Sequence, residues 1–227
     1  EDRTQALVAA HKKVLASRVA DLCLFTAIAL VARDVPNLRF DAVQALGEFG
    51  RALPGSLQLA AVLFAVAAAL KCAQLPFHGW LTQVMEAPTP VSALLHAGVV
   101  NIGGFLMIRL APLMAKATVA QTLLVIIGAT TAVVAALVMT MRVTVKVALA
   151  WSTIAQMGFM LVQCGLGAYQ LALLHILAHS LYKAHAFLSS GSAVELARTS
   201  KLAPSRQAPG LARWLVAAPV ALGAVAA

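Results

Sequence analysis

The sequence predicts an all-α protein, a polytopic bundle of transmembrane helices. Of its 227 residues, 61% are hydrophobic and 11% are charged, whereas soluble domains are roughly 45–50% apolar and about 25% charged. The mean hydropathy is +0.88, and no Asp, Glu, Lys or Arg occurs from Val147 to Tyr182. Apolar segments of about 20 residues are long enough to cross a bilayer as helices. The composition therefore indicates an integral membrane protein.

Apolar segments follow one another along the whole chain. Spans are expected at about residues 14–32, 56–72, 89–108, 117–141, 146–164, 169–190 and 214–227. Polar loops are expected at residues 33–55, with a short amphipathic helix around residues 40–49, and at residues 191–213. The chain begins with Glu1 and stops inside an apolar run. We therefore expect these residues to form part of a single larger membrane domain that is cut at both ends.

The charged residues lie mostly between the apolar spans. The formal net charge is +9, but the basic residues form no patch with interleaved aromatic residues, which disfavours nucleic-acid binding. Basic residues are more frequent on the side that holds the N-terminus, and the positive-inside bias makes that side cytoplasmic. The first span carries Arg18 and Asp21. Residues three apart on a helix are neighbours, so a structural ion pair between them is the favoured interpretation.

The second span is predicted to be a broken helix near residues 56–76. It is short for a bilayer-spanning helix, it ends at Lys71, and Pro76 follows soon after. Proline removes a helical hydrogen bond and interrupts the helix. Non-helical backbone at membrane depth is tolerated beside protein or a water-filled cavity, so Lys71 is expected to face a hydrated interior. The alternative is a lysine whose amino group reaches the membrane surface.

The regions on either side of Pro88 are predicted to be helical. Residues 79–86 are expected to form a short interfacial helix with Trp80 as its anchor. Thr89 as N-cap and Pro90 at the first helical position are typical of a helix start, and His96 lies two turns into the span that they begin. His96 is therefore a second candidate for a polar group within the membrane.

The sixth span carries the clearest candidate site. His175, His179 and Lys183 are spaced four apart, so they form one stripe on a helix. Titratable groups at membrane depth are costly and tend to mark ion or proton routes, and imidazole titrates in the physiological range. A proton relay is favoured over structural histidines and a lysine that reaches the surface. Lys146 lies at the start of its helix, where an interfacial role and a functional one are equally compatible with the sequence.

A metal site is a weaker interpretation of the same stripe. The spacing of His175 and His179 suits metal binding, which leaves open a membrane metalloenzyme. However, no Asp or Glu occurs between Glu86 and Glu195, and Lys183 one turn on would repel a cation. The three cysteines form no CxxC pair, so neither a disulfide framework nor a zinc motif is indicated.

Four stretches resemble the antiporter-like membrane subunits of respiratory complex I and of Mrp cation/proton antiporters. They read KCAQLPFHGWL from Lys71, MEAPTPVSALLH from Met85, VKVALAWSTIAQMGF from Val145 and HILAHSLYKAHAFLSSGS from His175. The resemblance covers nearly the whole chain. It implies a proton-translocating subunit in the bacterial inner membrane, not an enzyme, with no cofactor of its own. It further implies a hydrated path of six side chains: Lys71, His96, Lys146, His175, His179 and Lys183.

Finer differences within these motifs separate branches of the family. Complex I members usually read HAATMV where this chain reads HAGVVN. FHGWLTQVMEAPTPVSALLHAGVVN and AHSLYKAHAFLSSGSAV are most similar to the membrane subunits of DAB-type inorganic-carbon transporters. That resemblance implies a zinc-containing, carbonic-anhydrase-like soluble partner and proton flow that drives bicarbonate or CO2 accumulation. The alternative is a subunit of respiratory complex I (NADH-quinone oxidoreductase) or of an Mrp-type antiporter, with the other subunits of that assembly as partners.

Overall fold

In the computed structural model, the described part of the chain is all-α, as predicted. The structure describes residues 2–35, 42, 52–83 and 88–202, and no strand occurs among them. The elements are α1 (Asp2–Asp34), α3 (Gly55–Lys71), α4 (Gly79–Gln83), α5 (Thr89–Ala97), the 3-10 turn η2 (Val99–Asn101), α6 (Ile102–Arg109), α7 (Ala111–Met114), α8 (Thr118–Thr140), α9 (Val145–Gly165) and α10 (Tyr169–Leu202).

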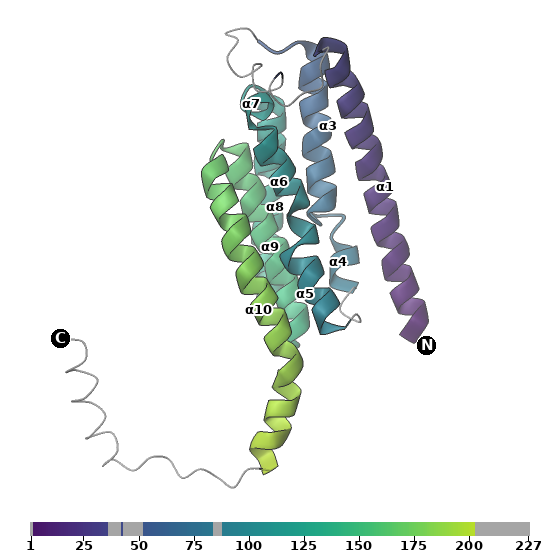
Figure 1. Ribbon diagram of the computed structural model, residues 1–227, viewed down its shortest axis with the longest axis vertical. Helices are drawn as coiled ribbons and strands as arrows, with labels where there is room; N and C mark the ends of the chain where they lie inside the picture. The colour runs from purple at the N-terminus through teal and green to yellow at the C-terminus, as the bar shows by residue number, and fades with distance from the viewer. Residues whose placement is uncertain (1, 36–41, 43–51, 84–87, 203–227) are drawn as a thin grey trace, which may run out of the picture. The chain divides into compact units, whose positions relative to one another are not determined.

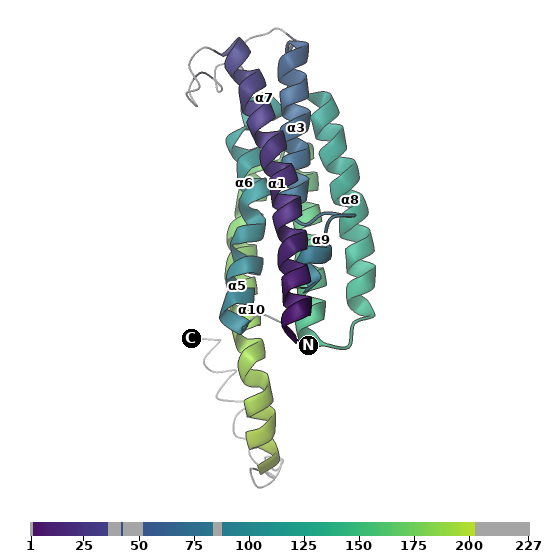
Figure 2. The same cartoon turned by 90° about the vertical axis from the view of Figure 1, so that its right-hand side faces the viewer.

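Residues 1–191 form one compact unit, and residues 192–227 form a second. Five stretches in the described residues are long and apolar enough to cross a membrane: 10–34, 89–109, 118–140, 145–165 and 169–191. Within the first unit, successive long helices run in alternating directions, α1 against α3 and α8 against α9 (Figures 1 and 2). This arrangement is that of a multi-pass membrane protein.

The predicted helix break is present between α3 and α4. The α3 helix ends at Lys71, Ala73 adopts a left-handed conformation with φ 52°, and the Leu75–Pro76 peptide bond is cis. The backbone N–H of Leu75 donates to Thr131 Oγ1 of α8 at 3.2 Å, so a neighbouring helix supplies a partner that the broken helix cannot. Trp80 is 5% exposed, and the Lys13 ammonium of α1 lies 5.9 Å from its ring centre; its position at the membrane interface stays a prediction.

The span from Thr89 to Arg109 contains a second interruption, which the sequence analysis did not predict. The α5 helix ends at Ala97, Gly98 follows with φ −119° and ψ −72°, and the tighter turn η2 comes next before α6 begins. At the start of the span, Thr89 is itself the first helical residue and not the N-cap, which is Pro88. A glycine followed by the β-branched Val99 and Val100 weakens the α-helix at this point.

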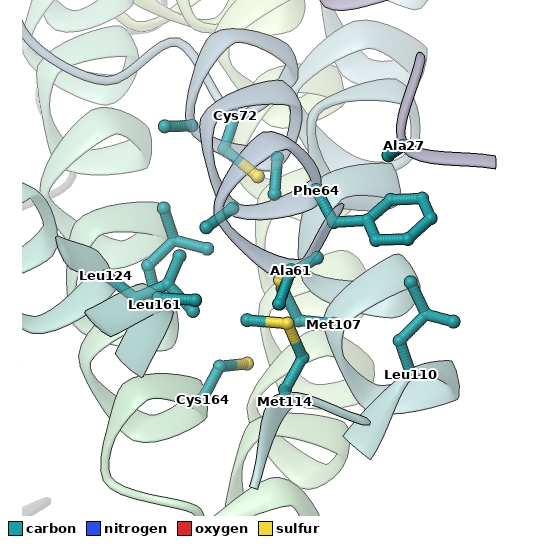
Figure 3. Close-up of a cluster of buried hydrophobic side chains, with 14 of the residues drawn as sticks. Ala27, Ala61, Phe64, Cys72, Met107, Leu110, Met114, Leu124, Leu161 and Cys164 are labelled. Carbon is teal, nitrogen blue, oxygen red and sulfur yellow. The ribbon is translucent and has the colours of Figure 1, made fainter. Parts of the chain in front are cut away.

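The core of the first unit lies among α3, α6, α8 and α9. Figure 3 shows part of it, including Cys72 directly after α3, Met107 of α6, Leu124 of α8 and Leu161 of α9. Small residues bring α8 and α9 very close. A Cβ atom built on Gly128 would lie 2.6 Å from the carbonyl oxygen of Gly158. Such close backbone approach is how membrane helices gain packing contacts without a hydrophobic driving force.

The prediction of a polar loop at residues 191–213 is wrong for the first part of that range. The α10 helix continues through residues 192–202, because this segment is rich in Ala, Leu, Glu and Lys and contains neither Gly nor Pro. The remainder of that loop, the expected final span at 214–227, the amphipathic helix around residues 40–49 and Glu86 lie outside the described residues.

Candidate functional site

Lys183 is fully buried on α10. Its Nζ donates to the carbonyl oxygen of Leu149 at 3.3 Å and to the Ser152 hydroxyl, both on α9, and its exposed fraction is 0%. Ser152 Oγ also donates to the Leu149 carbonyl at 2.9 Å. No carboxylate pairs with Lys183 among the described residues. A buried ammonium group held by neutral acceptors alone is costly, and such groups mark proton and ion routes in membranes.

His179 lies one turn before Lys183 and is 3% exposed. Its Nδ1 is 2.6 Å from Gln156 Oε1, and its Nε2 is 3.1 Å from the carbonyl oxygen of His96. Both ring nitrogens therefore face oxygen atoms. This arrangement suits a protonated imidazolium ring, which donates one hydrogen bond to Gln156 Oε1 and one to the His96 carbonyl oxygen. A neutral ring that donates from Nε2 to the His96 carbonyl has no hydrogen on Nδ1, so the Gln156 amide must rotate until its NH2 group donates to Nδ1. Gain or loss of a proton at His179 is thus coupled to the orientation of Gln156.

His175 completes the stripe at lower burial. Its Nδ1 lies 3.2 Å from Gln163 Oε1, its ring centre is 6.0 Å from that of His179, and the Phe159 ring lies 5.8 Å away. His185 is exposed, and its Nε2 lies 3.5 Å from Ser189 Oγ on the same helix. The stripe predicted from the four-residue spacing is therefore present, and His185 lies off it.

Each member of the stripe has a polar partner on α9. The two antiparallel helices pair Lys183 with Ser152, His179 with Gln156, and His175 with Gln163. We call these six residues the polar seam. The α9 half of the polar seam was not predicted from the sequence, although a signal was present: serine and glutamine at positions 152, 156 and 163 recur in a span that has no charged residue after Lys146.

His96 joins the polar seam from α5. Its ring stacks on Phe187 with ring centres 4.4 Å apart, and its backbone carbonyl accepts the contact from His179 described above. The side chain is 0% exposed, and neither ring nitrogen has a hydrogen-bond partner among the described residues. The structure therefore brings four of the six predicted residues together: His96, His175, His179 and Lys183.

Lys71 lies at a separate place, the end of α3. Its Nζ is 2.8 Å from Asp21 Oδ1 on α1. The predicted ion pair of Arg18 with Asp21 is also present, at 3.6 Å, with the Arg18 side chain 76% exposed. A cavity of about 120 Å³ adjoins Lys71; α1, α4 and the η2 interruption also line it. Asp21 was thus missed as the partner of Lys71. The available signal was an acidic residue within an apolar span, which calls for a cation from another helix.

Lys146 is half-buried in the first turn of α9. It lies one helical turn before Leu149, whose carbonyl accepts from Lys183. Its role stays a prediction. A metal centre finds no support in the described residues, because no three His, Cys, Asp or Glu side chains come together there.

These features define a polytopic membrane protein with buried ionisable side chains at the contacts between its helices. The chain belongs to the NADH:quinone oxidoreductase/Mrp antiporter transmembrane family, whose model matches residues 1–222. The family resemblance drawn from the sequence motifs is therefore confirmed.

Three relatives illustrate the range of the family. The chain is 50% identical over 213 residues to the probable inorganic carbon transporter subunit DabB of Hydrogenovibrio crunogenus, covering 94% of this chain and 41% of that protein. It is 38% identical to NADH-quinone oxidoreductase subunit L of Mycobacterium tuberculosis, in an alignment that covers 85% of this chain and 30% of that protein. The Mrp complex from Dietzia sp. is similar in structure, with a TM-score of 0.72 and 36% sequence identity. The matched region covers 79% of this chain and 20% of the chain in that complex. The chain thus spans about two fifths of the length of the first of these relatives.

Proposed function

We propose that this chain is part of a proton-translocating membrane subunit, and that the polar seam with His96 forms part of its proton route. One observation carries the proposal: Lys183 is fully buried with the neutral oxygen atoms of Leu149 and Ser152 as its hydrogen-bond partners, next to His179 whose two nitrogens both face oxygen atoms. Side chains that gain and lose protons at successive helical turns can pass a proton along the membrane interior. Lys71 with Asp21, and Lys146, extend the route at its ends.

The finer proposal is inorganic-carbon transport. Similarity to the probable inorganic carbon transporter subunits of Hydrogenovibrio crunogenus and Halothiobacillus neapolitanus, at 50% and 49% identity, supports it. In this function, proton flow through the subunit drives accumulation of bicarbonate or CO2 across a bacterial inner membrane. The proposed partner is a zinc-containing, carbonic-anhydrase-like soluble subunit.

The alternative is the same proton route in a different assembly. Identity of 44% over 137 residues to NADH-quinone oxidoreductase subunit L of Rhodobacter capsulatus supports a respiratory complex, and similarity to the Mrp complex supports an antiporter. In either case the energy source changes and the route through the membrane does not.

The proton route is tested by Lys183→Ala and Lys71→Ala in the full-length parent protein, reconstituted in vesicles with an imposed pH gradient. Both variants are expected to assemble in the membrane at normal abundance and to lose coupled transport. Wild-type proton flux in both variants would refute the route.

The carbon function is tested by purifying the tagged full-length parent from its native membrane, followed by mass spectrometry and zinc analysis of what accompanies it. A stoichiometric soluble zinc protein is the expected result. Flavin or iron–sulfur subunits would transfer the assignment to a respiratory complex, and sodium-antiporter subunits would transfer it to an Mrp-type assembly.

A further inference from the structure

One polar side chain is buried in the interruption between α5 and α6. Asn101 is the last residue of the 3-10 turn η2 and is 5% exposed. A short stretch of 3-10 helix within a longer helix often marks a hinge or a functional position. A buried amide also needs hydrogen-bond partners, so its contacts indicate what the interruption connects.

One side of the interruption faces Lys71. Val99 and Ile102, which flank the turn, line the cavity of about 120 Å³ that adjoins Lys71. Gly103 holds the chain against the last turn of α3, because a Cβ atom there would lie 2.5 Å from the Ala68 carbonyl oxygen. The missing side chain at Gly103 therefore allows the backbone of the interruption to approach the end of α3.

The other side faces the polar seam. Asn101 Nδ2 donates to Ser180 Oγ on α10 at 2.9 Å and to the Ala97 carbonyl oxygen at 2.7 Å. Ser180 directly follows His179, which contacts the His96 carbonyl at 3.1 Å. The Asn101 amide is thus joined to α10 beside a member of the polar seam.

Half of the hydrogen-bonding capacity of this amide is in use. Its Nδ2 group serves two acceptors, whereas Oδ1 is buried and accepts no hydrogen bond from the described residues. A carbonyl oxygen of this kind can accept a hydrogen bond from water. The Ser180 hydroxyl, which accepts from Asn101, keeps its own hydrogen for a further acceptor.

We propose that Asn101 is a positioning residue through which protons cross from the Lys71 cavity to the polar seam. The proposal rests on the proton route proposed above. Val99 and Ile102 line the cavity, and water that passes between them and the buried amide donates to Asn101 Oδ1, while Asn101 Nδ2 orients the Ser180 hydroxyl on the α10 side. The amide itself takes no proton. The proton passes from that water to the Ser180 hydroxyl, which releases its own proton toward the polar seam as it gains one, so nothing is consumed.

The test compares two nearly isosteric replacements, Asn101→Val and Asn101→Thr, in the full-length parent protein reconstituted in vesicles. Thr keeps a hydroxyl that can donate one hydrogen bond to Ser180 Oγ and accept one from water, whereas Val has neither capacity. We expect Asn101→Val to lower proton flux by about tenfold or more, since misplacing groups in a transfer pathway carries costs of this order. Asn101→Thr is expected to keep most of the flux. Membrane abundance and Tm are expected to be the same for the two variants.

Two further outcomes separate this inference from the proton route itself. If Lys183→Ala abolishes flux while Asn101→Val keeps wild-type flux, the role of Asn101 is refuted and the route stands. If Asn101→Thr loses as much flux as Asn101→Val at equal abundance and Tm, the hydrogen-bonding role is also refuted. Wild-type flux in Lys183→Ala would remove the proposed function on which the inference rests.

Discussion

Asp21 and Lys71 form an ion pair between α1 and α3, with 2.8 Å between Oδ1 and Nζ. The pair lies where α3 ends and the helix break begins, and both side chains are partly accessible, at 31% for Asp21 and 20% for Lys71. Opposite charges on two spans stabilise each other at membrane depth. Lys71 is thus the nearer of the two cations that Asp21 contacts, and the pair joins α1 to the end of α3.

The first prediction concerns this pair. Asp21→Asn keeps the shape of the side chain and removes its charge, so Lys71 loses the anion that fixes its position. We expect proton flux of the full-length protein in vesicles to fall by about tenfold. Arg18→Gln is the control: Arg18 lies 3.6 Å from Asp21 and its side chain is 76% exposed, so its flux should stay near wild type. Equal losses in the two variants would contradict a specific role for the pair.

The second prediction compares the two glutamines of the polar seam. Gln156→Leu removes the oxygen 2.6 Å from the nearly buried His179, whereas Gln163→Leu removes one 3.2 Å from the more accessible His175. An unsatisfied buried polar group costs about 1–3 kcal/mol, and water can replace a lost partner more readily at His175. We therefore expect a clearly larger loss of proton flux in Gln156→Leu. A larger loss in Gln163→Leu would mean that the buried part of the seam is not the limiting one.

The third prediction concerns the packing of α8 on α9. A Cβ atom on Gly158 would lie 2.7 Å from the Gly128 carbonyl oxygen and 2.8 Å from the Ala132 nitrogen. Gly158→Ala therefore forces the two helices apart, and overpacking of this kind costs about 1–3 kcal/mol. We expect a lower Tm in detergent. Gly55→Ala is the control, because no atom lies within 4 Å of a Cβ there, and an equal loss of Tm would argue against the close contact.

The fourth prediction concerns metals. Among the described residues, the histidines of the polar seam meet no third metal-ligating side chain, and a buried lysine follows His179 by one turn. We expect treatment of the purified full-length subunit with a chelator to leave its proton flux unchanged. Loss of flux that is restored by added zinc would instead support the metalloenzyme alternative.

Some of the fold follows from the sequence alone, for a local reason. The apolar spans, the helix break after Lys71 and the stripe of His175, His179 and Lys183 depend on composition, on the missing N–H of Pro76 and on helical periodicity. Each of these properties is contained in about 20 consecutive residues. The interruption at Gly98 and the helical continuation of α10 to Leu202 were missed, because both are choices between backbone states of similar local energy.

What only the tertiary structure decided is which polar groups meet. The contacts of Lys71 with Asp21, of His179 with Gln156 and of Asn101 with Ser180 join residues 50, 23 and 79 positions apart in the chain. No local pattern specifies such pairs. In an apolar interior each buried polar group needs a partner, and the packing of several helices at once determines which partner comes within reach. The sequence thus determined where polar groups enter the membrane, and the packing of the helices determined how they are connected.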